Sequence, residues 1–449
     1  MALTRELAGF CSSLRCDDVP TAAFPFIRIA FTDCFATLVA GRFSDPARIL
    51  RESLQPGAGT SRVFVDQGMA GAADAALLNG TAAHALDFDD AAQKGHISAA
   101  IVPAILAEAE VVGSTGGAMA TAYAAGYEAW AELFRREPDL HHNFSWHPTG
   151  VFGPIAAAVA CASLLHLDQE RTTHAIAIAA SECAGLIANF GSMAKPFVAG
   201  QAARAGVLAA RLAANGFTGN PEALEHPKGL LMGISPNRKA DVASPLLARG
   251  DWQLPVGGVN TKKYPTCFAT HRALDAMLWL VQEHDLRPAQ VKRIVATTSR
   301  RNKSTLRFER PEDGLQAKFS MQFALAAALL ARRLSLMELE DGFVRRDDLR
   351  ELMTRVEVQP EDREDPRRPG EAPQDVVCIE TADGRRFTRE VQYVRGGPEH
   401  PLSPGELFGK FESCLAYGRL AADAQKLFDA LMRIDSLPGT RALYASIER

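Results

Sequence analysis

Residues 79–96 of the chain have the sequence NGTAAHALDFDDAAQKGH. The first part of this stretch is a run of small residues at helical spacing, and three carboxylates follow it at Asp87, Asp89 and Asp90. Apolar packing does not need this concentration of ionisable groups, so the stretch predicts an Ala-rich helix that ends at a functional site. The alternative is a solvated helix end, or a cap for the next element, at which the carboxylates repel one another.

Length and composition limit the class of protein. At 449 residues the chain is long for a single hydrophobic core, so we expect two domains. Hydrophobic residues make up 47% and charged residues 23%, which is typical of globular proteins. The net charge of −4 offers no basic surface, so we expect no nucleic-acid partner.

We also expect a cytoplasmic protein without a membrane segment. No apolar run reaches the roughly 18 to 20 residues that a membrane helix needs, because charged residues interrupt the Ala-rich stretches. The first 15 residues contain an early arginine and glutamate and lack the apolar segment of a secretory signal.

The eight cysteines form no CxxC pair and no Cys/His cluster with the spacing of a zinc site. They lie in apolar helical surroundings, so we expect most of them to be buried, reduced thiols. The spacing therefore predicts no structural metal and no iron–sulfur cluster, and we expect no cofactor.

Residues 4–219 have the pattern of a helical domain, rich in Ala and Leu at helical spacing with Gly and Pro as punctuation. The expected helices span residues 99–112, 118–136, 150–165, 169–187 and 200–215. Small residues dominate one side of the last helix, as expected for the interior of a bundle. No strand-like alternation of any length occurs here, so we predict that the first domain is all-helical.

The pattern changes at about residue 256. Strands are expected at residues 291–298, 356–359, 375–381 and 386–391, with helices at 270–284, 319–332, 404–418 and 421–434. Charge and proline in residues 360–373 predict a surface loop. We predict a mainly α protein, in which residues 1–255 and 399–449 form a large helical domain and residues 256–398 form a smaller α+β domain.

His147 belongs to a second candidate site, Trp146-His147-Pro148-Thr149-Gly150. A histidine in a loop that opens a helix offers an imidazole beside a helix N-terminus, which is a favourable place for an anion. A lone histidine is more often structural, so both interpretations stay open at this point.

Lys195 lies in a third stretch, residues 189–197, where Ser192 and Lys195 have the spacing of the Ser-x-x-Lys acyl enzymes. The Ser-Asp-Asn and Lys-Thr-Gly elements of those enzymes are missing, and Pro196 argues against a helix that runs through the pair. A lysine between a Gly-rich loop and an apolar helix can instead bind a substrate carboxylate, or act as an acid once its pKa is lowered.

Lys262 opens the fourth candidate, the cationic stretch Lys262–Arg272 before a predicted helix. Such a cluster suits a dianionic or trianionic substrate, and the alternative is a solvated loop.

These strings together resemble the MmgE/PrpD family, whose members include 2-methylcitrate dehydratase, cis-aconitate decarboxylase and iminodisuccinate epimerase. The resemblance extends over nearly the full length of the chain and includes the segment at residues 319–323. It implies that five of the quoted side chains line an active site: Asp87, His96, His147, Lys195 and Lys262. It also implies a homodimer, with the active site between the helical domain and an α+β lid.

Family reactions begin with removal of a proton next to a carboxylate, which requires a positioned base and stabilisation of the resulting charge. The resemblance implies that Lys195 and Lys262 bind the carboxylates of a small polycarboxylate substrate. His96 and His147 are then the acid–base candidates. Asp87 orients a histidine and sets its tautomer. This chemistry needs no metal.

Three positions depart from the pattern of the decarboxylase branch: Cys267 replaces a histidine, Phe323 a tyrosine and Ala91 a threonine. These departures argue against cis-aconitate decarboxylation. A Cys267 thiolate with a pKa depressed by the nearby lysines can serve as a second acid–base group, or the residue is an inert filler. A base on each face of a carbon is what an epimerase requires. Because the decarboxylase residues are missing and the chain is compact, we expect an epimerase of an iminodisuccinate-like substrate first. A 2-methylcitrate dehydratase-like lyase and a non-catalytic helical scaffold are the alternatives.

Overall fold

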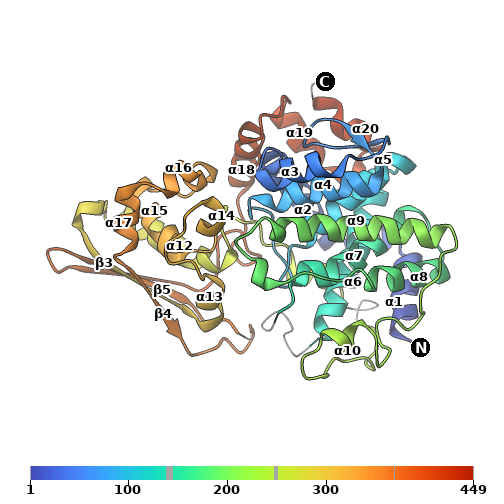
Figure 1. The fold of residues 1–449 in the computed structure, drawn as a ribbon, viewed down its shortest axis with the longest axis horizontal. Helices are drawn as coiled ribbons and strands as arrows, with labels where there is room; N and C mark the ends of the chain where they lie inside the picture. Colours follow the sequence, from blue (N-terminus) through green and yellow to red (C-terminus); the bar gives the residue numbers. More distant parts are fainter. Residues whose placement is uncertain (1, 138–144, 247–250, 369, 448–449) are drawn as a thin grey trace.

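The structure is a computed structural model that describes residues 2–137, 145–246, 251–368 and 370–447. Long helices form one large body, and a four-stranded sheet with shorter helices forms a smaller body beside it (Figure 1). This arrangement confirms a mainly α protein with a smaller mixed α and β part.

The large body is built around α4 (Ala72–Ala85), α5 (Ile97–Val112), α7 (Pro148–Leu164) and α9 (Ala194–Ala214), which pack against one another. Other helices surround them: α1 (Leu3–Ser13), α2 (Phe24–Gly41), α3 (Asp45–Leu54), α6 (Gly116–Arg135), α8 (Gln169–Ala180), α10 (Leu230–Ile234) and α11 (Gln253–Gly257). Because the central helices carry mostly small side chains, their backbones approach closely.

Three details of the large body differ from the sequence predictions. A two-stranded antiparallel ribbon, β1 (Ser61–Arg62) with β2 (Met69–Ala70), interrupts the helices, so the prediction of an all-helical domain is wrong here. These strands have two residues each, too few for alternation to be visible in the sequence. Helix α8 ends at Ala180, seven residues before the predicted end, and α9 begins at Ala194, before Pro196. Proline is tolerated in the first turn, where no intrahelical hydrogen bond is lost.

The smaller body contains a sheet with strand order β4-β3-β5-β6 (β3 Val291–Ser299, β4 Val356–Glu361, β5 Asp375–Thr381, β6 Arg386–Val391). Strand β4 runs parallel to β3, whereas β5 and β6 are antiparallel to their neighbours. Helices α12 (His271–Glu283) and α15 (Met321–Ala331) pack on the sheet, and α13 (Arg300–Thr305), α14 (Gly314–Ala317), α16 (Asp341–Val344) and α17 (Asp347–Met353) complete this body. The four strands lie where the sequence predicts them.

After the sheet, the chain returns to the large body (Figure 1). Helix α18 (Pro404–Tyr417) starts with a capping box between Ser403 and Glu406 and packs on α2, and α19 (Ala424–Leu431) and α20 (Thr440–Leu443) follow. We propose the domain boundaries given above, because they separate the buried hydrophobic clusters of the two bodies except at Val259 and Leu336.

One described segment, Thr21–Gly41, is long and apolar enough to cross a membrane by length and composition alone, contrary to the sequence expectation. In the structure 67% of its apolar window is buried. Its two charged side chains make ion pairs, Arg28 with Asp435 and Asp33 with Lys410. These are properties of a core helix.

The contact between α7 and α9 yields the first prediction. A Cβ added at Gly206 lies 2.3 Å from the Cβ of Ala157, so Gly206→Ala forces the two helices apart. We expect this variant to lower the free energy of unfolding by about 1–3 kcal/mol, measured by denaturant unfolding. Gly409→Ala in α18 is the matched control, because a Cβ there meets no atom within 4 Å, and we expect it to be neutral or stabilising. Equal effects of both changes would contradict the close packing.

Candidate active site

The carboxylates of residues 87–90 are buried, so the interpretation as a solvated helix end is wrong. Helix α4 ends at Ala85, and Asp87 adopts a left-handed backbone conformation with φ of 51°. This conformation is uncommon outside glycine and is found mostly where surrounding contacts hold it in place. The turn carries both the carbonyl group and the carboxylate of Asp87 into the buried cluster described next.

Asp87 joins two lysines that lie far apart in the sequence. Lys195, in the first turn of α9, donates to Asp87 Oδ1 at 2.6 Å. Lys262 donates to the Asp87 carbonyl oxygen at 2.7 Å, and its ammonium nitrogen lies 3.1 Å from Asp87 Oδ2. Burial alone would raise the pKa of Asp87, but these ammonium groups hold it well below its usual range. Asp87 is therefore a carboxylate with both oxygens next to cations.

Asp89 holds two histidines in one orientation. The Nδ1 atom of His84 lies 2.9 Å from Asp89 Oδ1, and the Nδ1 atom of His96 lies 2.9 Å from Asp89 Oδ2. Because Nδ1 of each ring faces an acceptor, the proton belongs on Nδ1 and the lone pair is on Nε2. His84 Nε2 accepts a hydrogen bond from Lys195 at 2.7 Å. His96 Nε2 lies 3.5 Å from Lys195 Nζ and remains the more available base.

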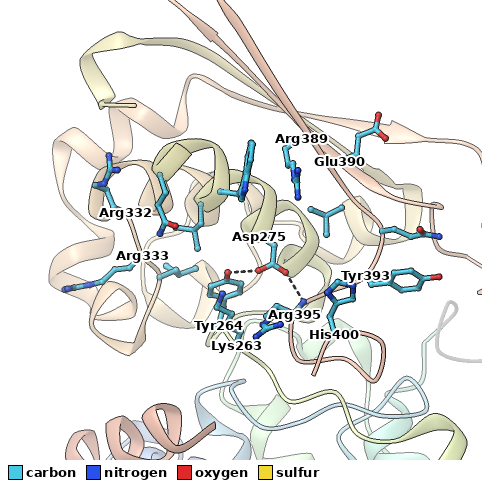
Figure 2. Close-up of a pocket in the computed structure, with 16 residues that line it drawn as sticks. Lys263, Tyr264, Asp275, Arg332, Arg333, Arg389, Glu390, Tyr393, Arg395 and His400 are labelled. Carbon is cyan, nitrogen blue, oxygen red and sulfur yellow. Dashed lines mark hydrogen bonds between the residues drawn. The ribbon is translucent and has the colours of Figure 1, made fainter. Parts of the chain in front are cut away.

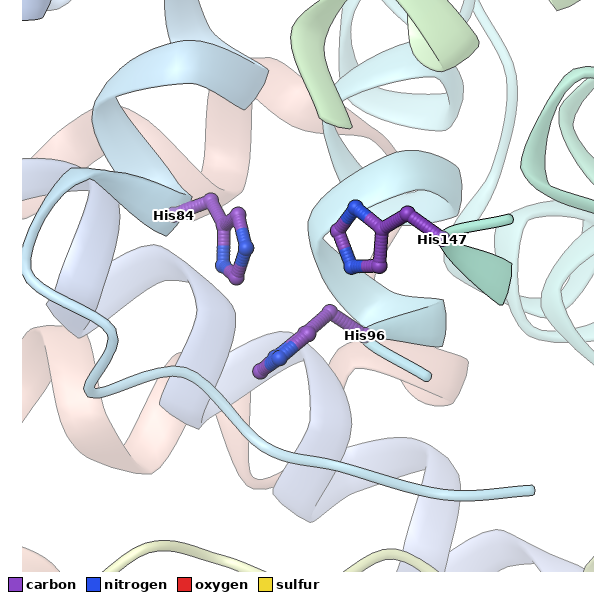
Figure 3. A group of neighbouring side chains, drawn as sticks. All are labelled: His84, His96 and His147. Atoms are coloured by element: carbon purple, nitrogen blue, oxygen red, sulfur yellow. The ribbon is translucent and has the colours of Figure 1, made fainter. Parts of the chain in front are cut away.

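His147 completes a group of three neighbouring imidazoles (Figure 3). Its ring centroid lies 6.2 Å from that of His84 and 6.3 Å from that of His96, and the edge of Phe190 packs against it at 4.9 Å. It is the residue that precedes α7, as the sequence predicts.

Burial lowers the pKa of all three histidines. The pKa of His84 falls to about 3, and that of His147 falls well below its usual value, because burial and nearby cations disfavour the imidazolium. The pKa of His96 is lowered by burial and by Lys195 and Lys262, although Asp89 opposes the shift. At neutral pH the cluster therefore contains neutral histidines beside charged lysines.

Two further lysines bind the backbone of the loop after α4. Lys318 donates to the carbonyl oxygen of Ala85 at 2.8 Å, and Lys410 donates to that of Phe88 at 2.8 Å. Burial lowers the pKa of Lys318 to about 8. Because Lys318 belongs to the smaller body and Lys410 to α18, segments from across the chain hold this loop.

Asp90 has the opposite electrostatic character to Asp87. Burial and the nearby Asp33 raise the pKa of Asp90 well above its usual range, so its carboxyl group carries a proton. It accepts a hydrogen bond from Ser98 at 2.6 Å, and Ser98 also contacts the hydroxyl group of Tyr123. We assign Asp90 to support of the loop.

The pKa of the Cys267 thiol differs from the sequence expectation. Burial and the charge of Asp87 raise the pKa of its thiol, although Lys262 and Lys195 act in the opposite direction. The expectation of a depressed pKa is therefore wrong, because burial and the charge of Asp87 outweigh the effect of the two lysines on the pKa. Cys267 is a protonated thiol that lies within the electrostatic range of the cluster.

The structure thus brings Asp87, His96, Lys195 and Lys262 into direct contact, with the His147 ring next to that of His96. The backbone N–H of Cys267 donates to the carbonyl oxygen of Lys318 at 2.9 Å. Lys262 is buried, so the solvated-loop interpretation fails for this residue and holds only for the exposed Lys263. Ser192 donates to the carbonyl oxygen of Asn189, and the acyl-enzyme interpretation gains no support.

Sequence reasoning missed three participants: His84, Asp89 and Lys318. His84 lies on the same helix as the small-residue run and five residues before Asp89, so a histidine followed by a carboxylate at this spacing was the available signal. No comparable local signal marks Lys318, which reaches the site from another domain.

Among the residues that the structure describes, two groups of side chains have donor atoms close enough to hold a metal ion: His84 with His96 and His147, and His84 with Asp87, Asp89 and His96. The donor atoms in each group lie within 4.8 Å of one another. However, the ammonium group of Lys195 already sits between His84 Nε2 and Asp87 Oδ1. In this arrangement the lysine supplies the cation of the cluster.

Comparison with known proteins agrees with the chemistry of this cluster. The model of the MmgE/PrpD N-terminal domain matches residues 5–243, and that of the MmgE/PrpD C-terminal domain matches residues 264–434. A cis-aconitate decarboxylase of Homo sapiens is 30% identical over 362 residues, which cover 76% of this chain and 72% of the relative. A cis-aconitate decarboxylase of Aspergillus terreus is 24% identical over 473 residues, which cover 97% and 94% of the two chains.

The neutral histidines provide the second prediction. In the folded protein, the ring ¹⁵N NMR shifts of His84 and His147 should not change between pH 8 and 5, whereas all histidines of the urea-unfolded protein should titrate near pH 6.5. The unfolded chain then binds more protons than the folded chain below about pH 6.5, so the free energy of unfolding should decrease as the pH falls. His84→Gln and His147→Gln identify the signals. Titration of the folded-state signals near pH 6.5 would contradict neutral, buried rings.

Proposed function

Because the chain belongs to the MmgE/PrpD family, we propose that it is a lyase that dehydrates a small hydroxy-substituted di- or tricarboxylate. That the chain is an enzyme of the lyase and dehydratase type follows from the family match and the decarboxylase relatives. The observation that carries the proposal is the neutral His96, whose Nε2 atom contacts the ammonium group of Lys195 at 3.5 Å, a longer contact than the 2.7 Å between Lys195 and His84.

In the proposed reaction, Lys195 and Lys262 bind a carboxylate of the substrate. His96 Nε2 removes the proton from the adjacent carbon, and the two ammonium groups stabilise the enolate-like charge that develops on the carboxylate. Asp89 stabilises the imidazolium that forms, since it faces His96 Nδ1 at 2.9 Å. This step needs a base that is neutral before the reaction, and the lowered pKa of His96 provides one.

The electron pair of the broken C–H bond then forms a carbon–carbon double bond, and the C–O bond to the hydroxyl group breaks. We assign the proton that converts the departing hydroxide to water to Cys267, because His147 is neutral and has no imidazolium proton to give. The raised pKa of Cys267 keeps its thiol protonated, so it can donate a proton but removes one poorly. Proton transfer from His96 back to the donor restores the enzyme.

This argument changes the order of the sequence expectations. An epimerase must remove a proton equally well from either face of the carbon in the two directions of the reaction. A Cys267 held as a thiol does not suit that role, and the relatives are lyases, so dehydration is now favoured over epimerisation of an iminodisuccinate-like substrate.

Decarboxylation of a tricarboxylate is the second candidate, because the relatives named above are cis-aconitate decarboxylases. Cys267, Phe323 and Ala91 depart from that branch, and Phe323 is buried in the hydrophobic cluster of the smaller body. We also propose, from the family resemblance alone, a cytoplasmic homodimer, whose oligomeric state light scattering would measure.

Proton NMR in heavy water separates the reactions and is the third prediction. The purified enzyme is incubated with 2-methylcitrate, citrate, cis-aconitate and iminodisuccinate. We expect an alkene signal from a hydroxy acid as the hydroxyl group is lost. Release of carbon dioxide from cis-aconitate would instead establish decarboxylation, and deuterium exchange with inversion of iminodisuccinate would establish epimerisation. His96→Gln should abolish whichever reaction is observed, because it removes the base but keeps the size of the side chain.

Lys318 yields the fourth prediction, a pH dependence. Below pH 8 its ammonium group adds positive charge near the substrate carboxylates, and above pH 8 this charge is lost. We expect kcat/KM to decrease on the alkaline side with a midpoint near pH 8, measured from steady-state rates. Lys318→Arg should move the midpoint upward by more than about one pH unit, because arginine stays protonated. Lys292→Arg on the exposed surface of β3 is the matched control, and an unchanged midpoint in Lys318→Arg would exclude Lys318 as its origin.

A further inference from the structure

The smaller body contains a cavity of about 680 Å³ between α12, β6 and the segments at residues 263–264 and 391–400 (Figure 2). Five of its lining residues are lysine or arginine, and two are acidic. None of the residues that line this cavity takes part in the proposed reaction.

Three of these cations are already neutralised by carboxylates. Arg332 pairs with Asp285, Arg333 with Glu338 and Arg395 with Glu406. These pairs build the rim of the cavity and leave little charge for a ligand.

Lys263 and Arg389 are different, because neither has a carboxylate within ion-pair distance among the residues that the structure describes. Each lies over an aromatic ring: Lys263 Nζ is 5.4 Å from the centre of the Tyr264 ring, and the Arg389 guanidinium is 4.4 Å from that of Trp279. Both side chains are exposed and line the same cavity. The aromatic faces hold the two cations in place without neutralising their charge.

The two acidic residues of the lining are occupied elsewhere. Asp275 accepts hydrogen bonds from the Tyr264 hydroxyl group at 2.7 Å and from the Arg395 backbone N–H at 3.0 Å, which ties α12 to both loops of the wall (Figure 2). Glu390 neighbours Arg389 on β6 and therefore projects from the other face of the strand, where Gln374 donates to it at 2.7 Å.

We propose that this cavity is a second anion site, separate from the catalytic cluster, which binds a small multivalent oxyanion bearing carboxylate or phosphate groups. Lys263 and Arg389 bind the charged groups, and the rings of Trp279 and Tyr264 supply the apolar walls. The backbone connects the two sites: the Thr261 N–H donates to the Gly396 carbonyl oxygen at 2.9 Å, and Lys262 and Lys263 follow directly. Lys263, which binds the ligand in this proposal, directly follows Lys262 of the proposed active site in the sequence.

The test is titration of the full-length protein with citrate and with pyrophosphate at constant ionic strength, followed by calorimetry and tryptophan fluorescence. We expect saturable binding that changes the emission of Trp279, and Trp279→Phe should remove this optical change. Lys263→Ala and Arg389→Ala should each weaken binding by about fivefold or more. Arg386→Ala removes the same charge from the opposite face of β6 and should have no effect. Citrate and pyrophosphate distinguish a carboxylate site from a phosphate site.

Lys195→Met separates this site from the catalytic one, since it damages the catalytic cluster and should leave the second binding event intact. Binding that is lost in Lys195→Met but kept in Arg389→Ala would overturn the proposal, because it would place the anion at the catalytic cluster. Equal weakening by Arg386→Ala and Arg389→Ala, or no saturation up to about 10 mM of either anion, would also overturn it.

Discussion

The buried carboxylate of Asp87 is the contact on which the proposed active site depends. It lies after α4, receives Lys195 from α9, and is approached by Lys262 from the segment that leads into the smaller body. A buried carboxylate without partners would be strongly destabilising, and so would two buried ammonium groups. Each charged side chain can therefore be buried only together with its partners. Burial of the cluster requires that the three chain segments come together.

The surrounding architecture makes this meeting possible. Small residues on α4 and α9 bring the two backbones together, and a Cβ at Gly200 would lie 2.3 Å from the carbonyl oxygen of Leu77. This close approach places the start of α9, with Lys195, beside the end of α4, with His84 and Asp87. Lys318 and Lys410 then bind backbone carbonyls of the same turn from other parts of the chain. Helix packing and electrostatics thus support the same loop.

The parts of the fold that periodicity controls could be predicted from the sequence. Strands β5 and β6 lie at the predicted residues, because alternation and the Asp383-Gly384 turn are local signals. The two-residue strands β1 and β2 carry no such signal. Contacts between distant segments were also hidden: nothing near Lys318 indicates that it binds the end of α4, and the pKa of Cys267 is set first by burial and then by Asp87, neither of which is visible in its sequence neighbours.

The site residues likewise divide into those that a local sequence motif reveals and those that only the structure reveals. Asp87, His96, His147, Lys195 and Lys262 were identified because their local motifs resemble those of a family, and the structure gathers them in one place. His84 was missed because a single histidine within a helix of small residues resembles ordinary core packing. Its role becomes visible only when Asp89 and Lys195 are found on its two ring nitrogens.

The pairing of Asp87 with two lysines also has a consequence for molecular selection. Before a ligand arrives, the positive charges of the two lysines are already partly neutralised by a carboxylate of the protein itself. An incoming anion must either share Lys195 and Lys262 with Asp87 or displace Asp87 from them. Its binding is therefore a competition with Asp87 for the two lysines. A molecule with one negative charge gains little from such an exchange, whereas one with two or three carboxylates can replace the contacts it disturbs. In the proposed active site, we therefore expect Asp87 to act as an internal competitor that discriminates between acids by their number of charges.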